Sequence, residues 1–291
     1  MKKRSLIKVL ACVMAAAFTF AGCGADKAST NEAVKSTSAV SNSSESDAEV
    51  DLSWEKVKEK GELVLGLDES FPPMGFRDDN NNIVGFDIDL AQEVANKLGV
   101  KLKLQPINWD TKEQELNTGN IDCIWNGFTI TEDRKENILF TDPYMTNQQI
   151  IVVLADSPYN TLADLKDKSV ALQASSSAVN ALNKNTEFKS TLKEVVELKD
   201  NNLCLMDLKT GNVDAVVMDE VVARYYIQMK GEKYRVLDEG LSTEEYGVGF
   251  RKTDVQLMTK VNEAIKEVSK DGKTTEFAIK WLGKDISITE K

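Results

Sequence analysis

The sequence from Trp54 onward alternates short apolar runs with helical segments, and this alternation restricts the fold more than any other feature of the chain. The apolar run Leu63–Leu67 predicts a buried strand, and Asp87–Leu98 predicts a helix because its apolar residues recur three and four positions apart. Lys101–Pro106 predicts the next strand. Strands that alternate with helices in this way predict an α/β fold with parallel, doubly wound sheets.

The same alternation continues through the rest of the chain. We expect further strands at Asp122–Trp125, Gln148–Leu154, Ser169–Gln173, Glu194–Leu198, Asp214–Met218 and Tyr234–Asp238, followed by an extended segment at Glu245–Phe250. The turn-rich segment after the first strand, with Pro72, Pro73 and Asp78–Asn82, predicts a loop and a hairpin that returns through Ile83–Phe86. We expect further helices at Asp110–Thr118, Ser177–Asn183, Asn201–Thr210 and Glu220–Lys230, and two terminal helices that carry Leu257, Val261 and Val268, and Phe277, Trp281 and Leu282.

A local repeat indicates two lobes that are built alike. Gly119–Ile124 and Gly211–Val216 share the pattern Gly-Asn, apolar residue, Asp, strand. We expect the aspartates of this pattern, Asp122 and Asp214, to be structural. In open α/β sheets ligands bind beyond the carboxyl ends of the strands, so the repeat predicts a cleft between two lobes. We assign residues 53–146 and 247–291 to lobe 1 and residues 147–246 to lobe 2, with the crossovers near Asn147–Gln149 and Thr243–Tyr246 as a hinge.

Composition excludes several classes of function. The chain has no histidine, which excludes Ser-His-Asp and Cys-His nucleophile pairs and histidine-ligated metals. Its formal net charge of −11 argues against nucleic acid as a partner, because phosphate binding requires a basic surface. We expect neither a metal nor a cofactor, and we expect the protein to act as a monomer.

The N-terminus predicts export and a lipid anchor. A basic start is followed by an apolar run too short to span a bilayer, so residues 1–22 are predicted to be a signal peptide. The small residues Ala21 and Gly22 before Cys23 resemble a bacterial lipobox, in which Cys23 is acylated; Phe20 departs from that pattern. The alternative is a plain secretory signal with an incidental cysteine. Residues 23–52 are predicted to be the lipidated cysteine and a disordered tether, because they are poor in large apolar residues.

Two cysteines remain for the folded part. Cys123 lies in a strand-like apolar run and Cys204 in a helix-like one. We expect two separate buried thiols; a disulfide between them is the alternative, and no spacing indicates a metal site.

Three stretches from Trp54 to Gly283 resemble family 3 extracellular solute-binding proteins, the polar amino-acid receptors of ABC importers. They are Gly85–Ala91 (GFDIDLA), Gly127–Arg134 (GFTITEDR) continued by Phe140–Tyr144, and Asp214–Asp219. The resemblance implies a two-lobed, type II periplasmic-binding-protein-like clamp with two crossover hinge strands.

The resemblance also implies ligand-binding residues. Arg134 matches the arginine that grips the ligand's α-carboxylate, a role that suits the paired donors of a guanidinium. Asp219 matches the acid that binds the α-amino group, and Thr129 and Gly127 match its partners in the first lobe. Ser176 and Ser177, at a helix start, match a hydroxyl pair for the carboxylate; ordinary N-capping by serine is compatible with that role.

The side-chain pocket is less specified. Asp68, Phe71, Trp109 and Asn126 match positions that line it, whereas Trp125 is as compatible with the core. The aromatic rings would cover a ligand, and Asp68 would attract a cationic side chain, although an acid near a turn is also a common loop residue.

The resemblance implies a binding protein without catalysis, which takes a polar or basic L-amino acid outside the cytoplasm to an ABC permease and its ATPase while lipid-anchored to the cell membrane. Two alternatives remain. One is an enzyme like the cyclohexadienyl or arogenate dehydratases on the same fold, in which Asp68 or Glu69 would have to donate a proton. The other is an extracellular amino-acid sensor module.

Overall fold

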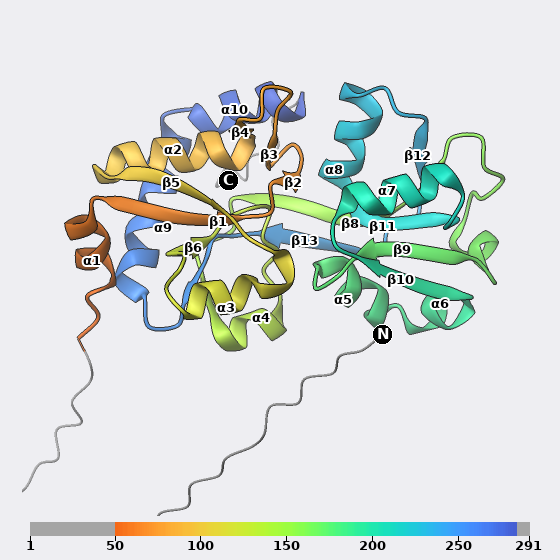
Figure 1. Ribbon diagram of the computed structural model, residues 1–291, viewed down its shortest axis with the longest axis horizontal. Coiled ribbons are helices and arrows are strands. Elements are labelled where there is room, and N and C mark those ends of the chain that lie inside the picture. The colour runs from red at the N-terminus through yellow and green to blue at the C-terminus, as the bar shows by residue number, and fades with distance from the viewer. Residues whose placement is uncertain (1–49, 284–291) are drawn as a thin grey trace, which may run out of the picture. The chain divides into compact units, whose positions relative to one another are not determined.

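The apolar runs of the sequence become the central strands of two sheets in the computed structural model, which describes residues 50–283 (Figure 1). The predicted signal peptide, Cys23 and nearly all of the predicted tether lie outside these residues. Both Cys123 and Cys204 are buried free thiols, so the expectation of two separate thiols is confirmed. Among residues 50–283, no helix is long and apolar enough to cross a membrane.

The first sheet has the strand order β5-β1-β6-β14-β7. Its β5, β1 and β6 are parallel, and β14 runs antiparallel to both of its neighbours. Helices cover both faces, with α2, α9 and α10 on one and α3 on the other (Figure 1). The strands are β1 (Glu62–Leu67), β5 (Lys101–Pro106), β6 (Cys123–Ile124), β7 (Ile138–Phe140) and β14 (Gly249–Arg251). The helices are α1 (Ser53–Lys60), α2 (Phe86–Leu98), η1 (Trp109–Thr111), α3 (Lys112–Asn117), α4 (Glu132–Asn137), α9 (Val255–Lys270) and α10 (Lys273–Leu282).

The second sheet has the order β10-β9-β11-β8-β12, and β13 pairs with β8 outside this path. Its β10, β9 and β11 are parallel, whereas β8 is antiparallel to β11. The strands are β8 (Met145–Leu154), β9 (Ser169–Gln173), β10 (Glu194–Leu198), β11 (Ala215–Asp219), β12 (Tyr234–Val236) and β13 (Ser242–Tyr246). The helices are η2 (Leu162–Leu165), α5 (Ser177–Lys184), α6 (Thr186–Thr191), α7 (Asn201–Thr210), α8 (Glu220–Arg224) and a π-helical turn, η3 (Tyr225–Met229).

A three-stranded hairpin sheet follows the first strand. It consists of β2 (Ser70–Phe71), β3 (Gly75–Arg77) and β4 (Ile83–Val84), as the turn-rich sequence between the first strand and the first long helix predicts. The hairpin brings Phe71 beside the carboxyl end of β1, which is the edge where the sequence predicts a ligand site.

The repeated Gly-Asn-x-Asp pattern has the same structural role in both sheets. Asp122 accepts a hydrogen bond from the backbone nitrogen of Val64 at 2.7 Å, and its own nitrogen donates to the Val64 carbonyl. Asp214 makes the same two contacts with Ser169 at the start of β9. Each aspartate therefore fixes the start of a central strand, which agrees with the structural role expected for both.

Several predicted bounds differ from the structure by a few residues, as at Ile83–Phe86, where the strand ends at Val84 and Phe86 begins α2. Two predicted segments differ more. The segment Glu245–Phe250 was predicted as one extended segment, but it contributes to β13 and β14, which lie in different sheets. The chain changes sheets at Gly247, where a Cβ atom would lie 2.8 Å from the Ile130 side chain. The predicted helix Glu220–Lys230 is α-helical only to Arg224 and continues as the π-helical turn.

The crossovers pair with each other. β8 and β13 run antiparallel, with Asn147 opposite Glu244 and Met145 opposite Tyr246. We call this two-stranded segment the crossover ribbon; it carries the chain between the two sheets in both directions. The predicted lobe boundaries at 147 and 246 fall within this ribbon and stay predictions.

Candidate functional site

Eight of the ten sequence-predicted site residues line one small cavity at the carboxyl ends of the central strands. The cavity has a volume of about 10 Å³, which is too small for an amino acid, so the lobes are closed upon each other. A ninth residue of the lining, Gln173, was not among the predicted ones. The lining consists of Phe71, Trp109, Gly127, Thr129, Arg134, Gln173, Ser176, Ser177 and Asp219.

Arg134 is a buried cation at this cavity. It lies in the short helix α4, whose start is capped by Thr131, and only 8% of its surface is exposed. Its Nη1 donates to the Thr129 carbonyl at 2.7 Å, and its guanidinium lies 4.4 Å from the centre of the Phe128 ring. Burial lowers its pKa to about 10, which leaves it charged at neutral pH. Within residues 50–283 no carboxylate forms an ion pair with Arg134, so its charge is available to an anion.

Asp219 is a buried acid at the same cavity. It ends β11 and is 4% exposed. Its Oδ1 accepts hydrogen bonds from Asn147 Nδ2 at 2.8 Å and from the Tyr246 hydroxyl at 2.6 Å. No lysine or arginine among the described residues forms an ion pair with it. Both partners come from the crossover ribbon, which therefore positions the acid.

The start of α5 supplies hydroxyl groups from the second lobe. Ser175 adopts a left-handed conformation with φ of 56°, which ends β9 sharply and turns the next residues into the cavity. The Ser176 hydroxyl donates to the Gln173 carbonyl at 2.6 Å and makes no capping bond to α5, so its side chain does not cap the helix. The Ser177 and Thr129 hydroxyls lie 3.1 Å apart and join the two lobes.

Asp68 and Asn126, the two other predicted residues, lie beside the lining. Asp68 is buried, and its Oδ2 accepts a hydrogen bond from Gln173 Nε2 of the opposite lobe at 2.8 Å. Burial raises its pKa, and the charge of Asp200 adds to this effect. Asn126 Oδ1 accepts from the Asp68 backbone nitrogen at 3.0 Å. Asn126 therefore fixes the backbone of Asp68.

Lys112, at the start of α3, was not predicted. Its ammonium is buried, lies 5.0 Å from the centre of the Trp109 ring and donates to the Ser175 carbonyl of the opposite lobe at 2.9 Å. Burial lowers its pKa to about 8, and the positive charge of Arg134 acts in the same direction. No pattern in the sequence indicates this role, because a lysine in a polar helix is normally solvated.

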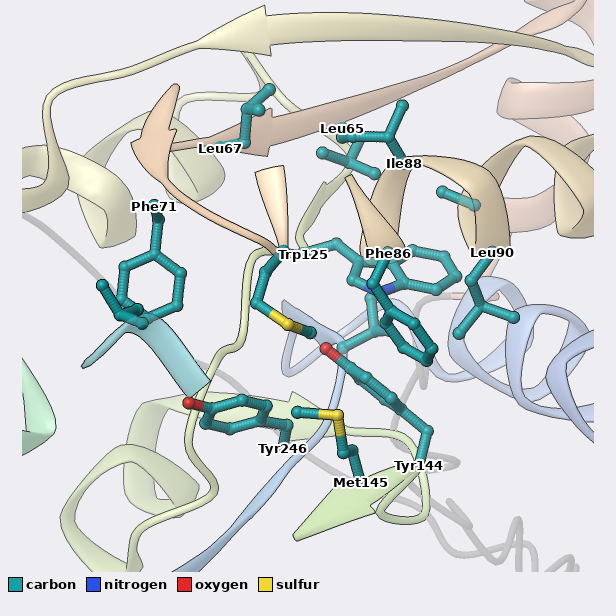
Figure 2. Close-up of a cluster of buried hydrophobic side chains, with 14 of the residues drawn as sticks. Leu65, Leu67, Phe71, Phe86, Ile88, Leu90, Trp125, Tyr144, Met145 and Tyr246 are labelled. Carbon is teal, nitrogen blue, oxygen red and sulfur yellow. The ribbon is translucent and has the colours of Figure 1, made fainter. Parts of the chain in front are cut away.

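The turn that presents Gly127 depends on a buried acid. Gly127 has φ of 56°, and a Cβ atom there would lie 2.8 Å from the Phe71 ring, so a glycine is required. Asp87 Oδ2 accepts a hydrogen bond from the Gly127 nitrogen at 2.6 Å. Figure 2 shows the aromatic surroundings of this turn: Tyr144, Trp125 and Phe86 pack together in the core, near Tyr246. Trp125 is fully buried and belongs to the core.

Comparisons with known proteins find a matching family model and individual relatives. The family model of bacterial extracellular solute-binding proteins, family 3, matches residues 63–284. The L-cystine-binding protein TcyJ of Escherichia coli (strain K12) is 32% identical over 80% of this chain and 86% of its own length.

Solved structures match as well. A substrate-binding protein of an ABC uptake transporter from Streptococcus pneumoniae with bound histidine is 39% identical and has a TM-score of 0.79. The match covers 82% of this chain and 99% of that protein's chain. Tv2483 bound to L-arginine is 35% identical with a TM-score of 0.78, over 82% of this chain and 97% of its own. The predicted type II, two-lobed fold is confirmed.

Asp87 predicts a pH dependence of stability. Burial raises its pKa from 3.8 to about 7 in the folded protein, while the hydrogen bond from Gly127 acts in the opposite direction. The folded protein therefore holds a proton that the unfolded chain has lost. This contribution is complete below the unfolded pKa and disappears as the pH rises through about 7.

We expect Asp87→Asn, whose amide oxygen can still accept from Gly127, to weaken the loss of stability with rising pH by up to about 1.4 kcal/mol per pH unit. Urea unfolding at several pH values measures this slope. Asp133→Asn, on the exposed side of α4, is the control and should follow the wild type. Equal slopes for Asp87→Asn and wild type would contradict a protonated Asp87.

Proposed function

Because the chain belongs to the bacterial extracellular solute-binding proteins, family 3, we propose that it binds a polar or basic L-amino acid between its lobes and delivers it to the permease of an ABC importer. One observation carries this proposal: a buried arginine and a buried aspartate line one cavity, and neither has an ion-pair partner among the described residues. A free amino acid supplies both missing charges.

The roles of the two charges follow from their chemistry. The α-carboxylate of the ligand accepts paired hydrogen bonds from the Arg134 guanidinium, whose geometry matches a carboxylate. The α-ammonium binds the Asp219 carboxylate. Thr129 and Ser177 add hydroxyl groups from both lobes, and the backbone at Gly127 lies beside them. Leaving these charges unpaired after closure is costly, so a ligand with both groups is favoured.

The side chain of the ligand lies toward Asp68, Phe71 and Trp109. Two aromatic surfaces and a buried carboxylate suit a polar or cationic side chain. Relatives of this chain are described as binding histidine, arginine and cystine, which are polar or basic. We therefore assign the same class of ligand to this chain.

We propose that binding is not followed by catalysis. Of the two acids that a dehydratase-like reaction would use, Glu69 forms an ion pair with Arg77 on the half-exposed hairpin, and Asp68 is held by Gln173. The relatives named above are binding proteins. Incubation with prephenate or L-arogenate followed by product analysis tests this: any turnover would favour the enzyme.

Closure of the lobes is the proposed signal to the permease. The described contacts between the lobes include Lys112 with the Ser175 carbonyl and Asp68 with Gln173. On another side of the cleft, the Tyr225 ring in η3 lies 5.4 Å from the Phe76 ring of the hairpin. These contacts require closed lobes, and a ligand that bridges both lobes favours that state.

Delivery to a permease requires the protein to stay near the membrane. We propose that Cys23 is acylated after removal of residues 1–22, that residues 23–52 tether the folded part, and that it works as a monomer on the extracytoplasmic face.

The first test identifies the ligand and its carboxylate contact. A thermal-shift screen against the amino acids should show stabilisation by about 2.7 kcal/mol at a ligand concentration of about one hundred times Kd. Arg134→Lys keeps the charge but loses the planar pair of donors, so titration calorimetry should show a tenfold to hundredfold weaker affinity for every ligand. Arg224→Lys, on the surface of α8, is the control. Unchanged affinity in Arg134→Lys would make the carboxylate assignment wrong.

The second test measures closure. Small-angle scattering should give a smaller radius of gyration with ligand than without it, and Asp219→Asn should reduce this change at equal ligand concentration, because one of the bridging contacts is weakened. Asp133→Asn should behave like the wild type. Identical curves for free and saturated wild-type protein would count against a clamp.

The third test concerns the anchor. Cys23→Ser removes the acylated thiol, so the protein should move from the membrane fraction to the soluble fraction or the medium. Cys12→Ser, within the predicted signal peptide, is a matched control that should leave fractionation unchanged. If the Cys23→Ser protein stayed in the membrane fraction, the lipid-anchor proposal would be wrong.

A further inference from the structure

A second acid, Glu244, lies against Asp219 and was not among the predicted site residues. It belongs to β13 of the crossover ribbon, opposite Asn147 of β8. Its Oε1 accepts hydrogen bonds from Asn147 Nδ2 and Gln149 Nε2, both at 2.8 Å, and from the hydroxyls of Thr129 at 3.1 Å and Ser177 at 3.3 Å. Two of these donors, Thr129 and Ser177, line the cavity, and Glu244 contacts them from outside the lining. We call Glu244, Asn147 and Gln149 the floor of the site.

Glu244 and Asp219 form a pair of carboxyl groups. The same Asn147 Nδ2 donates at 2.8 Å to an oxygen of each acid. Within the described part of the chain, neither acid forms an ion pair with a lysine or arginine. Because both acids accept from the same Nδ2 atom, their negative charges repel each other, and this repulsion together with burial favours the protonated form of Asp219.

Within residues 50–283, the side-chain amides of Asn147 and Gln149 each leave one buried oxygen without a hydrogen-bond donor. Asn147 is 3% exposed and Gln149 is fully buried, and the side-chain oxygen of each has no hydrogen-bond partner among the described residues. Buried amide oxygens normally accept a hydrogen bond. These two oxygens belong to the same side-chain amides whose NH₂ groups donate to Glu244. A ligand group with several N–H donors could donate hydrogen bonds to them.

The charged and titratable groups around the pair come from three elements. Tyr246, on β13, donates to Asp219, and its own pKa is raised well above the usual tyrosine value by burial and by both acids. The negative charges of Glu244 and Asp219 raise the pKa of Arg134, on α4, against the opposite effect of burial. Lys112 and Glu113, on α3, act on Arg134 in opposite directions. Burial and the charge of Glu244 raise the pKa of Asp219 to about 8.

We propose that Glu244 and Asp219 together bind the α-ammonium group of the ligand, and that this ammonium displaces the proton which Asp219 holds in the ligand-free protein. This inference rests on the proposed function and adds Glu244 as a specificity-determining residue. No covalent bond changes. The proton leaves for solvent, the ammonium keeps its three protons, and one positive charge replaces another between the acids.

The exchange has a measurable consequence. Binding at neutral pH releases close to one proton, so the affinity rises about tenfold per pH unit below about pH 8, and the rise ends where the α-ammonium group of the ligand itself loses its proton. The sign is fixed because the ligand-free protein binds the extra proton. Ligands that lack an α-ammonium group gain nothing from the pair.

The test uses the whole mature protein with L-arginine, L-histidine, L-glutamine and L-cystine as probes. Titration calorimetry in buffers of different ionisation enthalpy counts the protons released by the probe that binds. Glu244→Gln keeps the shape and the acceptor oxygen but removes the charge. Glu245→Gln, the exposed neighbour on the same strand, is the matched control.

We expect wild type and Glu245→Gln to release close to one proton at neutral pH. In Glu244→Gln the affinity near pH 8.5 should fall tenfold or more, the difference from wild type should shrink toward low pH, and the pH slope should flatten. A merely structural role would lower the affinity by the same factor at every pH. Tighter binding by Glu244→Gln would show that the carboxylate competes with the ligand and would overturn the proposal.

A second measurement needs no ligand. Carbon-detected NMR of the side-chain carboxyl groups in the free protein should show one of the two acids protonated at neutral pH, and Glu244→Gln should lower the pKa of Asp219. If both carboxyl groups were ionised at neutral pH, the proposed proton on Asp219 would be absent and the proposal would be overturned. If a probe binds wild type without proton release, this inference fails while the proposed function stands; if no amino acid binds, both fail.

Discussion

Unpaired buried charge is the constraint on which this structure depends. Arg134 lies in the closed cavity without an ion-pair partner among residues 50–283, and Asp219 lies there beside a second acid. Burying isolated charges is unfavourable, and a folded protein normally pairs them within its own chain. We propose that another molecule supplies the pairing here, which would give the site its affinity and its requirement for a zwitterion.

The crossover ribbon connects this charge arrangement to movement of the lobes. Asn147, Gln149, Glu244 and Tyr246 lie on its two strands, and they hold Asp219 and contact the hydroxyls of both lobes. A segment that carries the chain between lobes is where rotation is expected. We therefore expect a ligand that contacts the floor of the site to act directly on the ribbon rather than through the cores of the lobes.

The sequence determined the sheets and most of the cavity lining. The strands Lys101–Pro106, Ser169–Gln173 and Glu194–Leu198 have the bounds that alternation and turn residues predict, because short apolar runs between polar turns have few other stable arrangements. The short polar helix α4 has no apolar period to detect. Arg134 was nevertheless identifiable, because the motif around it is specific even though its helix is not.

Only the tertiary structure decided which polar residues meet. Lys112, Gln173 and Glu244 look like ordinary surface residues in the sequence, yet folding buries the first two and brings the third against Asp219. Their hydrogen-bond partners across the cleft, Ser175, Asp68 and Thr129, lie 63 or more positions away in the chain. The sequence by itself specifies periodicity and local motifs. The choice of contacts across the cleft depends on the pairing of β8 with β13 and on closure of the lobes, which no local pattern encodes.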